Sequence, residues 1–234
     1  NTYCTILSID KYHMTEEEKT RLKKMVKEIT TMPIVEIPPE AKSLKDFSEK
    51  DRNTILRLDE MFWEEITCMK AGRIFSEVNP VGGGEKAEAV KDAARREGVS
   101  LADVMYVGDS ITDVEALRLV KENHGLAVSF NGNQYAIKNA EIAVLSEHNM
   151  ITTVIVDVFS RFGREETISL VENWNHEALK KSPVNQALLN SLFRLYPTEL
   201  PKVKIITREN MEILAKESSE FRKKVRGEAI GRLG

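Results

Sequence analysis

The sequence predicts an α/β fold, a three-layer sandwich with a parallel sheet, to which a helical insertion and a helical C-terminal extension are added. Short strands and helices alternate between residues 104 and 145, as in βαβ units. The strands are continuously apolar, which is typical of parallel sheets covered by helices on both faces. A length of 234 residues suffices for one large domain, or for a compact domain with an appendage.

The first third of the sequence is expected to be mainly helical. Residues 3–9 alternate as in a strand, but the Thr-Glu-Glu-Glu stretch at residues 15–18 is a capping box that opens a helix. After a proline-rich connection, residues 43–78 again show a helical pattern. We therefore assign residues 1–11 to the core and residues 12–78 to a mainly helical insertion, or cap.

The middle of the sequence is expected to complete the core, over residues 79–163. A glycine-rich loop opens this region, and strands and helices follow it in alternation. The expected elements are helices over 85–97, 111–122 and 134–139, and strands over 104–107, 126–130 and 142–145.

Residues 164–234 are expected to form a helical extension with a lone strand candidate at 203–206. Its last helix is amphipathic and is bordered by lysine and arginine. Docking onto its own domain is the simplest role for this helix. A homodimer contact, or a contact with another protein in a complex, is the alternative.

The composition excludes several classes of protein. The 34 Lys and Arg residues nearly balance the 37 Asp and Glu residues, for a net charge of −3, so we expect no nucleic-acid partner. No apolar run approaches the about 18 residues that span a membrane, and no secretory leader is visible, which favours a cytoplasmic location. Two cysteines are too few for a disulfide framework.

The sharpest chemical signal is Gly-Asp-Ser-Ile-Thr-Asp at residues 108–113, directly after an apolar strand. Asp109 is expected at the carboxyl end of that strand and Asp113 one helical turn later, at the sheet edge where ligands of open α/β sheets bind. Two carboxylates at this edge suit a hard cation such as Mg²⁺. The alternative is purely structural, with Asp113 capping a helix and Asp109 closing a turn.

A second signal is Gly-Gly-Gly-Glu-Lys, a loop that enters a helix and carries Lys86. Backbone amides at a helix N-terminus favour anions, and the lysine adds a positive charge. The loop also fits G-x-G-x-x-A, so a dinucleotide site is an alternative. Against it, Asn-Pro precedes the loop where that fingerprint needs a strand.

A third signal is Asn-Gly-Asn, with Asn131 and Asn133, at the end of the next strand. These residue types are typical of a tight turn, and this structural role is expected. The position beside Asp109 suggests in addition a contact with substrate.

Together these segments resemble the haloacid dehalogenase-like (HAD) phosphohydrolase superfamily, whose core is a Rossmannoid sandwich. The resemblance covers about residues 80–160 and implies roles for single residues. Lys86 would stabilise the nucleophile and the phosphoryl group, Asp109 would bind Mg²⁺ directly and Asp113 through water. Gly84, Ser110, Asn131 and Asn133 would bind the phosphate or the substrate. Within the superfamily, the sequence is most similar to archaeal HAD-like proteins, some of which are described as accessory subunits of an energy-converting hydrogenase.

The sequence departs from this superfamily in one respect. HAD phosphatases attack with the first Asp of an Asp-x-Asp-x-Thr motif and form an aspartyl-phosphate, yet no Asp-x-Asp occurs here. Because the sequence begins with Asn1 rather than Met, we expect the nucleophile to lie upstream of it. Three functions stay open: a Mg²⁺-dependent phosphatase of a phosphorylated small molecule, a non-catalytic accessory subunit or docking module, and a dinucleotide-binding domain.

Overall fold

The computed structural model describes residue 3 and residues 11–38, 41–78 and 80–227. The chain divides into two compact units, Asn1–Tyr3 with Val81–Gly234, and Cys4–Pro80. The strand expected over residues 3–9 lies outside the described residues, except for Tyr3, which is not in a strand.

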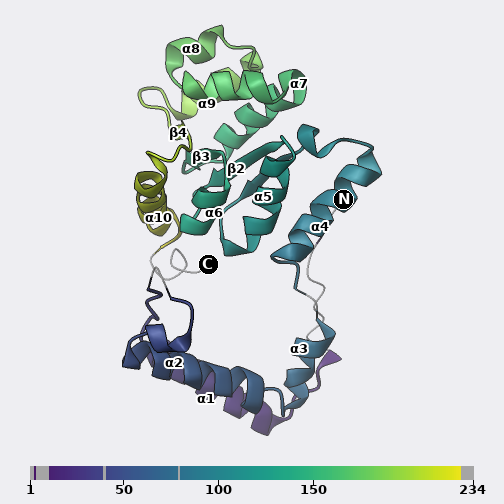
Figure 1. The fold of residues 1–234 in the computed structure, drawn as a ribbon, viewed down its shortest axis with the longest axis vertical. Coiled ribbons are helices and arrows are strands. Elements are labelled where there is room, and N and C mark those ends of the chain that lie inside the picture. Colours follow the sequence, from purple (N-terminus) through teal and green to yellow (C-terminus); the bar gives the residue numbers. More distant parts are fainter. Residues whose placement is uncertain (1–2, 4–10, 39–40, 79, 228–234) are drawn as a thin grey trace. The chain divides into compact units, whose positions relative to one another are not determined.

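The smaller unit is helical, as expected (Figure 1). Its first helix has the expected capping box, because Thr15 accepts from the backbone of Glu18 while the Glu18 carboxylate accepts from the backbone of Thr15. A small core rich in methionine includes Met25 and Met61. Its helices are α1 (Glu16–Thr31), η2 (Leu44–Asp46), α2 (Glu49–Asp59), η3 (Glu60–Glu65), η4 (Lys70–Arg73) and α3 (Ile74–Glu77).

The larger unit is built on a four-stranded sheet in the order β1-β2-β3-β4, with strands β1 (Met105–Gly108), β2 (Leu126–Phe130), β3 (Ile142–Leu145) and β4 (Lys202–Ile205). The first three strands are parallel, which confirms the expected α/β fold. The fourth pairs antiparallel with β3, so the sheet is mixed rather than wholly parallel. Sequence alone located this strand candidate to within one residue but did not attach it to the sheet.

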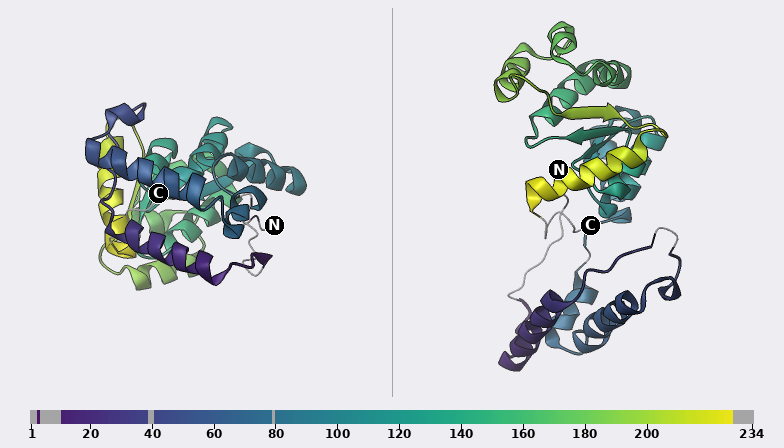
Figure 2. Two further views of the ribbon diagram at one scale, coloured as in Figure 1. Left: turned by 90° about the horizontal axis from the view of Figure 1, so that it is seen from below. Right: turned by 90° about the vertical axis from the view of Figure 1, so that its left-hand side faces the viewer.

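Helices cover both faces of the sheet, as Figure 2 shows. On one face, Val128 and Val144 pack with apolar side chains of α7 and α9. On the other, Ala127 packs with α5 and α6, and Leu145 packs with α6 and α10. The helices are α4 (Gly84–Glu97), η5 (Leu101–Asp103), η6 (Ile111–Asp113), α5 (Val114–Glu122), α6 (Gln134–Asn139), α7 (Met150–Glu172), α8 (His176–Lys181), α9 (Gln186–Leu195) and α10 (Met211–Arg226).

The C-terminal extension packs into the same hydrophobic core as one face of the sheet. Helix α7 crosses the expected boundary at residue 163 and is kinked there, because Gly163 has a φ of 79°. Ile155 before the kink and Leu170 after it belong to one hydrophobic cluster, together with Val203 of β4. The domain boundary at residue 163 stays a prediction, and the packing is continuous across it.

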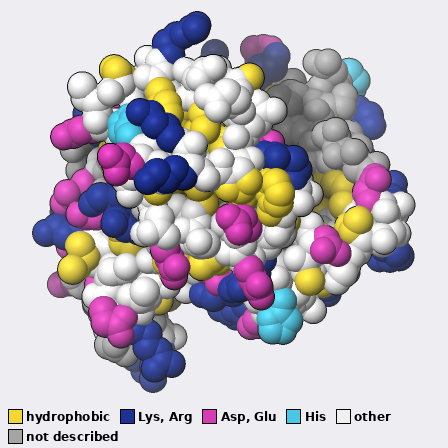
Figure 3. Space-filling view, turned by 90° about the horizontal axis from the view of Figure 1, so that it is seen from above, with side chains coloured by type: hydrophobic (Ala, Val, Ile, Leu, Met, Phe, Trp, Pro, Cys, Tyr) yellow, Lys and Arg dark blue, Asp and Glu magenta, His cyan; other side chains and the backbone are white. Residues whose placement is uncertain are grey.

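The face seen in Figure 3 carries basic and acidic side chains intermixed, in keeping with the balanced composition. Of the helices within the described residues, none combines the length and the apolar character that crossing a membrane requires.

Candidate active site at the carboxyl end of β1

Strand β1 ends in a tight turn that only glycine permits. A Cβ on Gly108 would lie 2.6 Å from Cβ of Asp113 and 2.9 Å from its Cγ. These distances are below any normal contact between carbon atoms, so a side chain at this position would push Asp113 away. The glycine therefore allows the chain to fold back and place Asp113 against the end of the strand.

Asp113 is nearly fully buried and holds the turn together. Its Oδ2 accepts from the backbone N–H groups of Asp109 and Ser110, each at 3.0 Å, and from the Ser110 hydroxyl at 3.1 Å. Its Oδ1 accepts from Lys86 Nζ at 2.7 Å and from the Tyr106 hydroxyl at 2.9 Å. The expected cap of the following helix is not formed, because the Asp113 side chain bonds back to the turn and makes no cap hydrogen bond to α5; the same carboxylate also binds the lysine.

These contacts decide the charge of Asp113. Burial by itself raises the pKa of this carboxyl, but the hydrogen bonds from Lys86, from the backbone and from Tyr106 outweigh it and hold the pKa at about 2. Burial and the adjacent carboxylate also raise the pKa of the Tyr106 hydroxyl, which therefore stays a donor. The site thus contains an ionised, buried carboxylate at neutral pH.

Lys86 reaches this carboxylate from the first turn of α4. The loop before the helix is fastened by Gly83, whose N–H donates to the Thr112 carbonyl at 2.9 Å and whose φ of 53° favours glycine. Lys86 Nζ donates in addition to Thr112 Oγ1 at 3.0 Å. Gly84 is the first residue of the helix, and its α-carbon has open space around it.

Asp109, the predicted metal ligand, is in contact with two arginines of α10. Its Oδ2 accepts from Arg222 Nη1 at 2.6 Å and lies 2.8 Å from Arg226 Nη1. The Asp109 side chain remains 31% exposed, whereas that of Arg222 is only 4% exposed. The carboxylate expected to attract a metal ion is therefore already beside two positive charges.

The two asparagines of the third motif make structural contacts. Asn131, at a φ of 48°, donates from Nδ2 to the Ser146 carbonyl at 2.7 Å and accepts from the Ser146 N–H at 2.9 Å. Asn133 caps α6, because its Oδ1 accepts from the N–H groups of Tyr135 and Ala136. These contacts are those of the expected turn, and the suggested contact with substrate stays a prediction for both residues.

The structure thus brings four predicted residues together at one edge of the sheet, namely Lys86, Asp109, Ser110 and Asp113. Sequence reasoning missed four of their partners, which are Tyr106, Thr112, Arg222 and Arg226. Thr112 lies inside the motif and Tyr106 in the strand before it, so proximity could have suggested both. Lysine and arginine residues border the last helix in the sequence, but nothing in their spacing points to Asp109.

The oxygen atoms at Asp109 are of the chemical type that binds Mg²⁺. This ion is usually held by one or two carboxylates, with water and substrate oxygens completing its shell. No group of three or more His, Cys, Asp or Glu side chains that could hold a metal ion occurs within the described residues. Asp113 already accepts from Lys86, Tyr106 and the turn, and Asp109 Oδ2 already contacts Arg222 and Arg226. The role of Asp109 as a direct Mg²⁺ ligand stays a prediction. The role of Asp113 as a ligand through water stays a prediction.

The dinucleotide alternative is not supported by the local structure. Its fingerprint requires a strand that leads directly into the glycine loop. Here α3 ends at Glu77, and the described residues between it and α4 contain no strand.

Comparisons with known proteins show the family of the chain. A family model for haloacid dehalogenase-like hydrolases matches residues 2–155. Over 98 residues the chain is 32% identical to a phosphoserine phosphatase of Archaeoglobus fulgidus, and the match covers 41% of this chain and 27% of that protein. The chain thus spans about a quarter of the length of this curated relative.

The fold also resembles a solved structure of a gene product from Archaeoglobus fulgidus. The TM-score is 0.69 at 21% identity, and the match covers 98% of this chain and 58% of the other. The expected similarity to archaeal HAD-like proteins is therefore confirmed. Because the family model covers more than half of its residues, the chain belongs to the haloacid dehalogenase-like hydrolases.

Proposed function

We propose that this chain is the cation-binding and lysine-bearing part of a Mg²⁺-dependent phosphatase that acts on a phosphorylated small molecule. The observation that carries the proposal is the 2.7 Å contact between Lys86 Nζ and Asp113 Oδ1, next to the Asp109 carboxylate at the end of β1. This contact places a lysine and a second carboxylate at the edge where ligands of α/β sheets bind. The phosphoserine phosphatase relative supports the reaction class.

Each residue of the site has a separate task in this proposal. Lys86 donates to phosphoryl oxygens and neutralises their charge, while Asp113 holds the lysine in place. Asp109 would hold Mg²⁺, which when bound supplies further positive charge for the phosphoryl group. Ser110 and the start of α4 at Gly84 offer donors for the remaining oxygens.

No Asp-x-Asp occurs within this sequence, so in this proposal the nucleophile is supplied by residues outside it. We propose that it is an aspartate that forms an aspartyl-phosphate, as a third carboxylate beside Asp109 and Asp113. Strand β1 supports this arrangement: within the described residues it pairs only with β2, and Val107 is 38% exposed. A further parallel strand on the other side of β1 would bring its carboxyl end next to Asp109.

The test uses the protein expressed from the full open reading frame that encodes this sequence. Its hydrolysis of p-nitrophenyl phosphate, phosphoserine and a panel of phosphomonoesters is measured with Mg²⁺ and with EDTA. We expect Mg²⁺-dependent turnover that Lys86→Met and Asp109→Asn each lower at least 100-fold. Lys91→Met is the matched control, because Lys91 lies on the same helix and pairs with Glu88 at the exposed surface.

Two results decide between the proposal and its alternative. Turnover that Lys86→Met leaves unchanged would refute the site. No turnover of any phosphomonoester, with metal binding retained, would instead favour the non-catalytic accessory subunit or docking module.

A further inference from the structure

Helix α10 directs three side chains, at four-residue intervals, toward the turns that follow β1 and β2. The Ser218 hydroxyl donates to the Gly132 carbonyl at 2.7 Å and is fully buried. Arg222 and Arg226, one and two turns later, reach the Asp109 carboxylate. Because the helix contacts the proposed metal ligand itself, it belongs to the site and not only to the scaffold.

Arg222 occupies a position with the chemistry of a cation site. Its Nη1 donates to Asp109 Oδ2 at 2.6 Å, to the Asp109 carbonyl at 2.9 Å and to the Asn131 carbonyl at 3.3 Å. A carboxylate and backbone carbonyls are oxygen donors of the type that hard divalent cations use. Three such oxygens converge on one nitrogen of a guanidinium that is almost completely buried.

We propose that Arg222, assisted by Arg226, takes the place of the divalent cation at Asp109, so that the metal ion and docked α10 compete for this carboxylate. A divalent ion on Asp109 Oδ2 would share that oxygen with two full positive charges. This inference rests on the proposed function, because it concerns the regulation of the same site. It makes α10 an internal inhibitor of metal binding.

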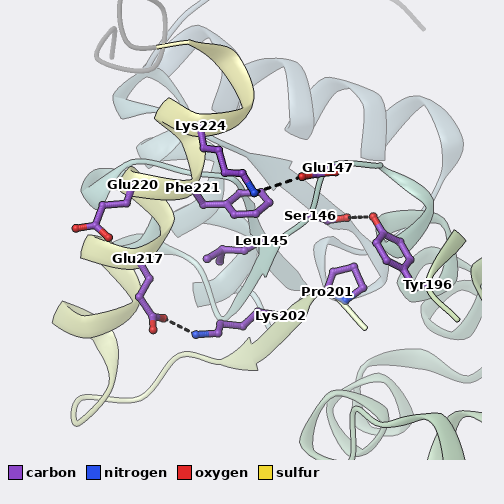
Figure 4. A pocket seen from close by; sticks show the side chains of 10 residues that line it. All are labelled: Leu145, Ser146, Glu147, Tyr196, Pro201, Lys202, Glu217, Glu220, Phe221 and Lys224. Carbon is purple, nitrogen blue, oxygen red and sulfur yellow. Dashed lines mark hydrogen bonds and ion pairs between the residues drawn. The ribbon is translucent and has the colours of Figure 1, made fainter. Parts of the chain in front are cut away.

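The packing of α10 allows such an exchange. A pocket of about 600 Å³ lies beside the helix, next to the ends of β3 and β4 (Figure 4). Phe221 of the helix lines this pocket together with Leu145 and Pro201, and ion pairs such as Lys202–Glu217 bridge its border. Since one side of the helix borders a pocket, moving it sacrifices fewer apolar contacts than moving a helix enclosed on that side as well.

Competition has a reciprocal consequence. If docked α10 weakens metal binding, bound metal must weaken the docking of α10 by the same factor. Two independent measurements on the 234-residue chain therefore test one coupling, and neither requires catalysis.

The first measurement is the affinity for Mg²⁺, and for Mn²⁺ as a second probe, by isothermal titration calorimetry. We expect Arg222→Gln to bind the ion at least tenfold more tightly than the unmodified chain, which corresponds to about 1.4 kcal/mol. Arg226→Gln should show a smaller gain in the same direction. Lys216→Gln is the matched control, because it removes one positive charge from an exposed position of the same helix.

The second measurement is hydrogen exchange in α10. Saturating Mg²⁺ should increase deuterium uptake in this helix of the unmodified chain and leave α5 unchanged. Circular dichroism checks the folding of each variant. Should Arg222→Gln fail to fold, Arg226→Gln decides, since Arg226 is 36% exposed and its loss opens no buried position.

Three results would overturn the inference. Equal affinities of the unmodified chain and of both arginine variants would show that the arginines do not compete. A gain that persists when Asp109→Asn is added would place the ion elsewhere. Absence of metal binding in every folded variant would refute both the inference and the metal site of the proposed function, whereas equal, measurable affinities refute the inference alone.

Discussion

Replacing Asp113 with asparagine should strongly destabilise the larger unit, since this side chain joins β1, the turn after it and α4. The amide oxygen of Asn can still accept from the backbone N–H groups of Asp109 and Ser110. Its NH₂ group would then face Lys86 Nζ, which is itself a donor. The substitution therefore removes a charge-assisted hydrogen bond and leaves a partly buried lysine without its carboxylate.

The size of the effect follows from the pKa of Asp113. The carboxyl falls from a reference pKa of 3.8 to about 2 in the folded chain. At about 1.4 kcal/mol for each pKa unit, the folded state gains on the order of 2 kcal/mol from ionised Asp113. Because the folded pKa is the lower one, this contribution is present above about pH 4 and is lost as the pH falls toward 2. Asp113→Asn should lack both the stability and this pH dependence.

The assay is urea unfolding followed by tryptophan fluorescence in a Trp63→Phe background. Trp174 then reports on the larger unit, where its Nε1 donates to the Pro201 carbonyl. At pH 7 we expect Asp113→Asn to lower the free energy of unfolding by about 2 to 3 kcal/mol. A double-mutant cycle with Lys86→Met should return a coupling of about 1.5 to 3 kcal/mol.

A matched surface pair provides the control. Lys202 and Glu217 are separated by 2.8 Å, but both side chains are well exposed, so Lys202→Met should cost less than about 0.5 kcal/mol. The reasoning is refuted if Asp113→Asn at pH 7 costs no more than this control. A cost that does not diminish between pH 4 and pH 2 would refute the electrostatic part of it.

Two further pairs of substitutions test the turns that build the site. Gly108→Ala places a Cβ 2.6 Å from Cβ of Asp113 and should lower the free energy of unfolding by about 1 to 3 kcal/mol, measured by urea unfolding. Gly84→Ala is its control, because the α-carbon of Gly84 has open space around it, and it should change the free energy of unfolding by no more than about 0.5 kcal/mol. Asn131→Ala should lower the free energy of unfolding by about 2 to 3 kcal/mol, because two hydrogen bonds to Ser146 are lost and Ala disfavours a φ of 48°. Asn131→Gly loses the same hydrogen bonds but tolerates this φ, so its loss of stability should be about 1 kcal/mol smaller. Equal losses for the two variants would contradict the role of the backbone.

Much of the architecture could be predicted from local sequence signals. Helix α1 begins where its capping box predicts, and α4 ends at the glycine expected to stop it. The continuously apolar strands correctly indicated a sheet covered on both faces. The attachment of β4 could not be predicted, because a four-residue strand carries no information about which neighbour it pairs with.

The candidate site, too, could be predicted from the sequence only in part. Sequence alone predicted that Asp109 and Asp113 lie at the carboxyl end of a parallel strand, where ligands of α/β sheets bind. The glycine-rich loop before a helix and the resemblance to the HAD superfamily added Lys86 to the same site. Only the tertiary structure decided what each carboxylate contacts. Asp113 binds Lys86, and Asp109 binds Arg222, which is 113 positions away in the chain. A partner at such a separation depends on how α10 packs across the sheet, and the periodicity of a helix specifies its apolar face but not the surface on which that face rests.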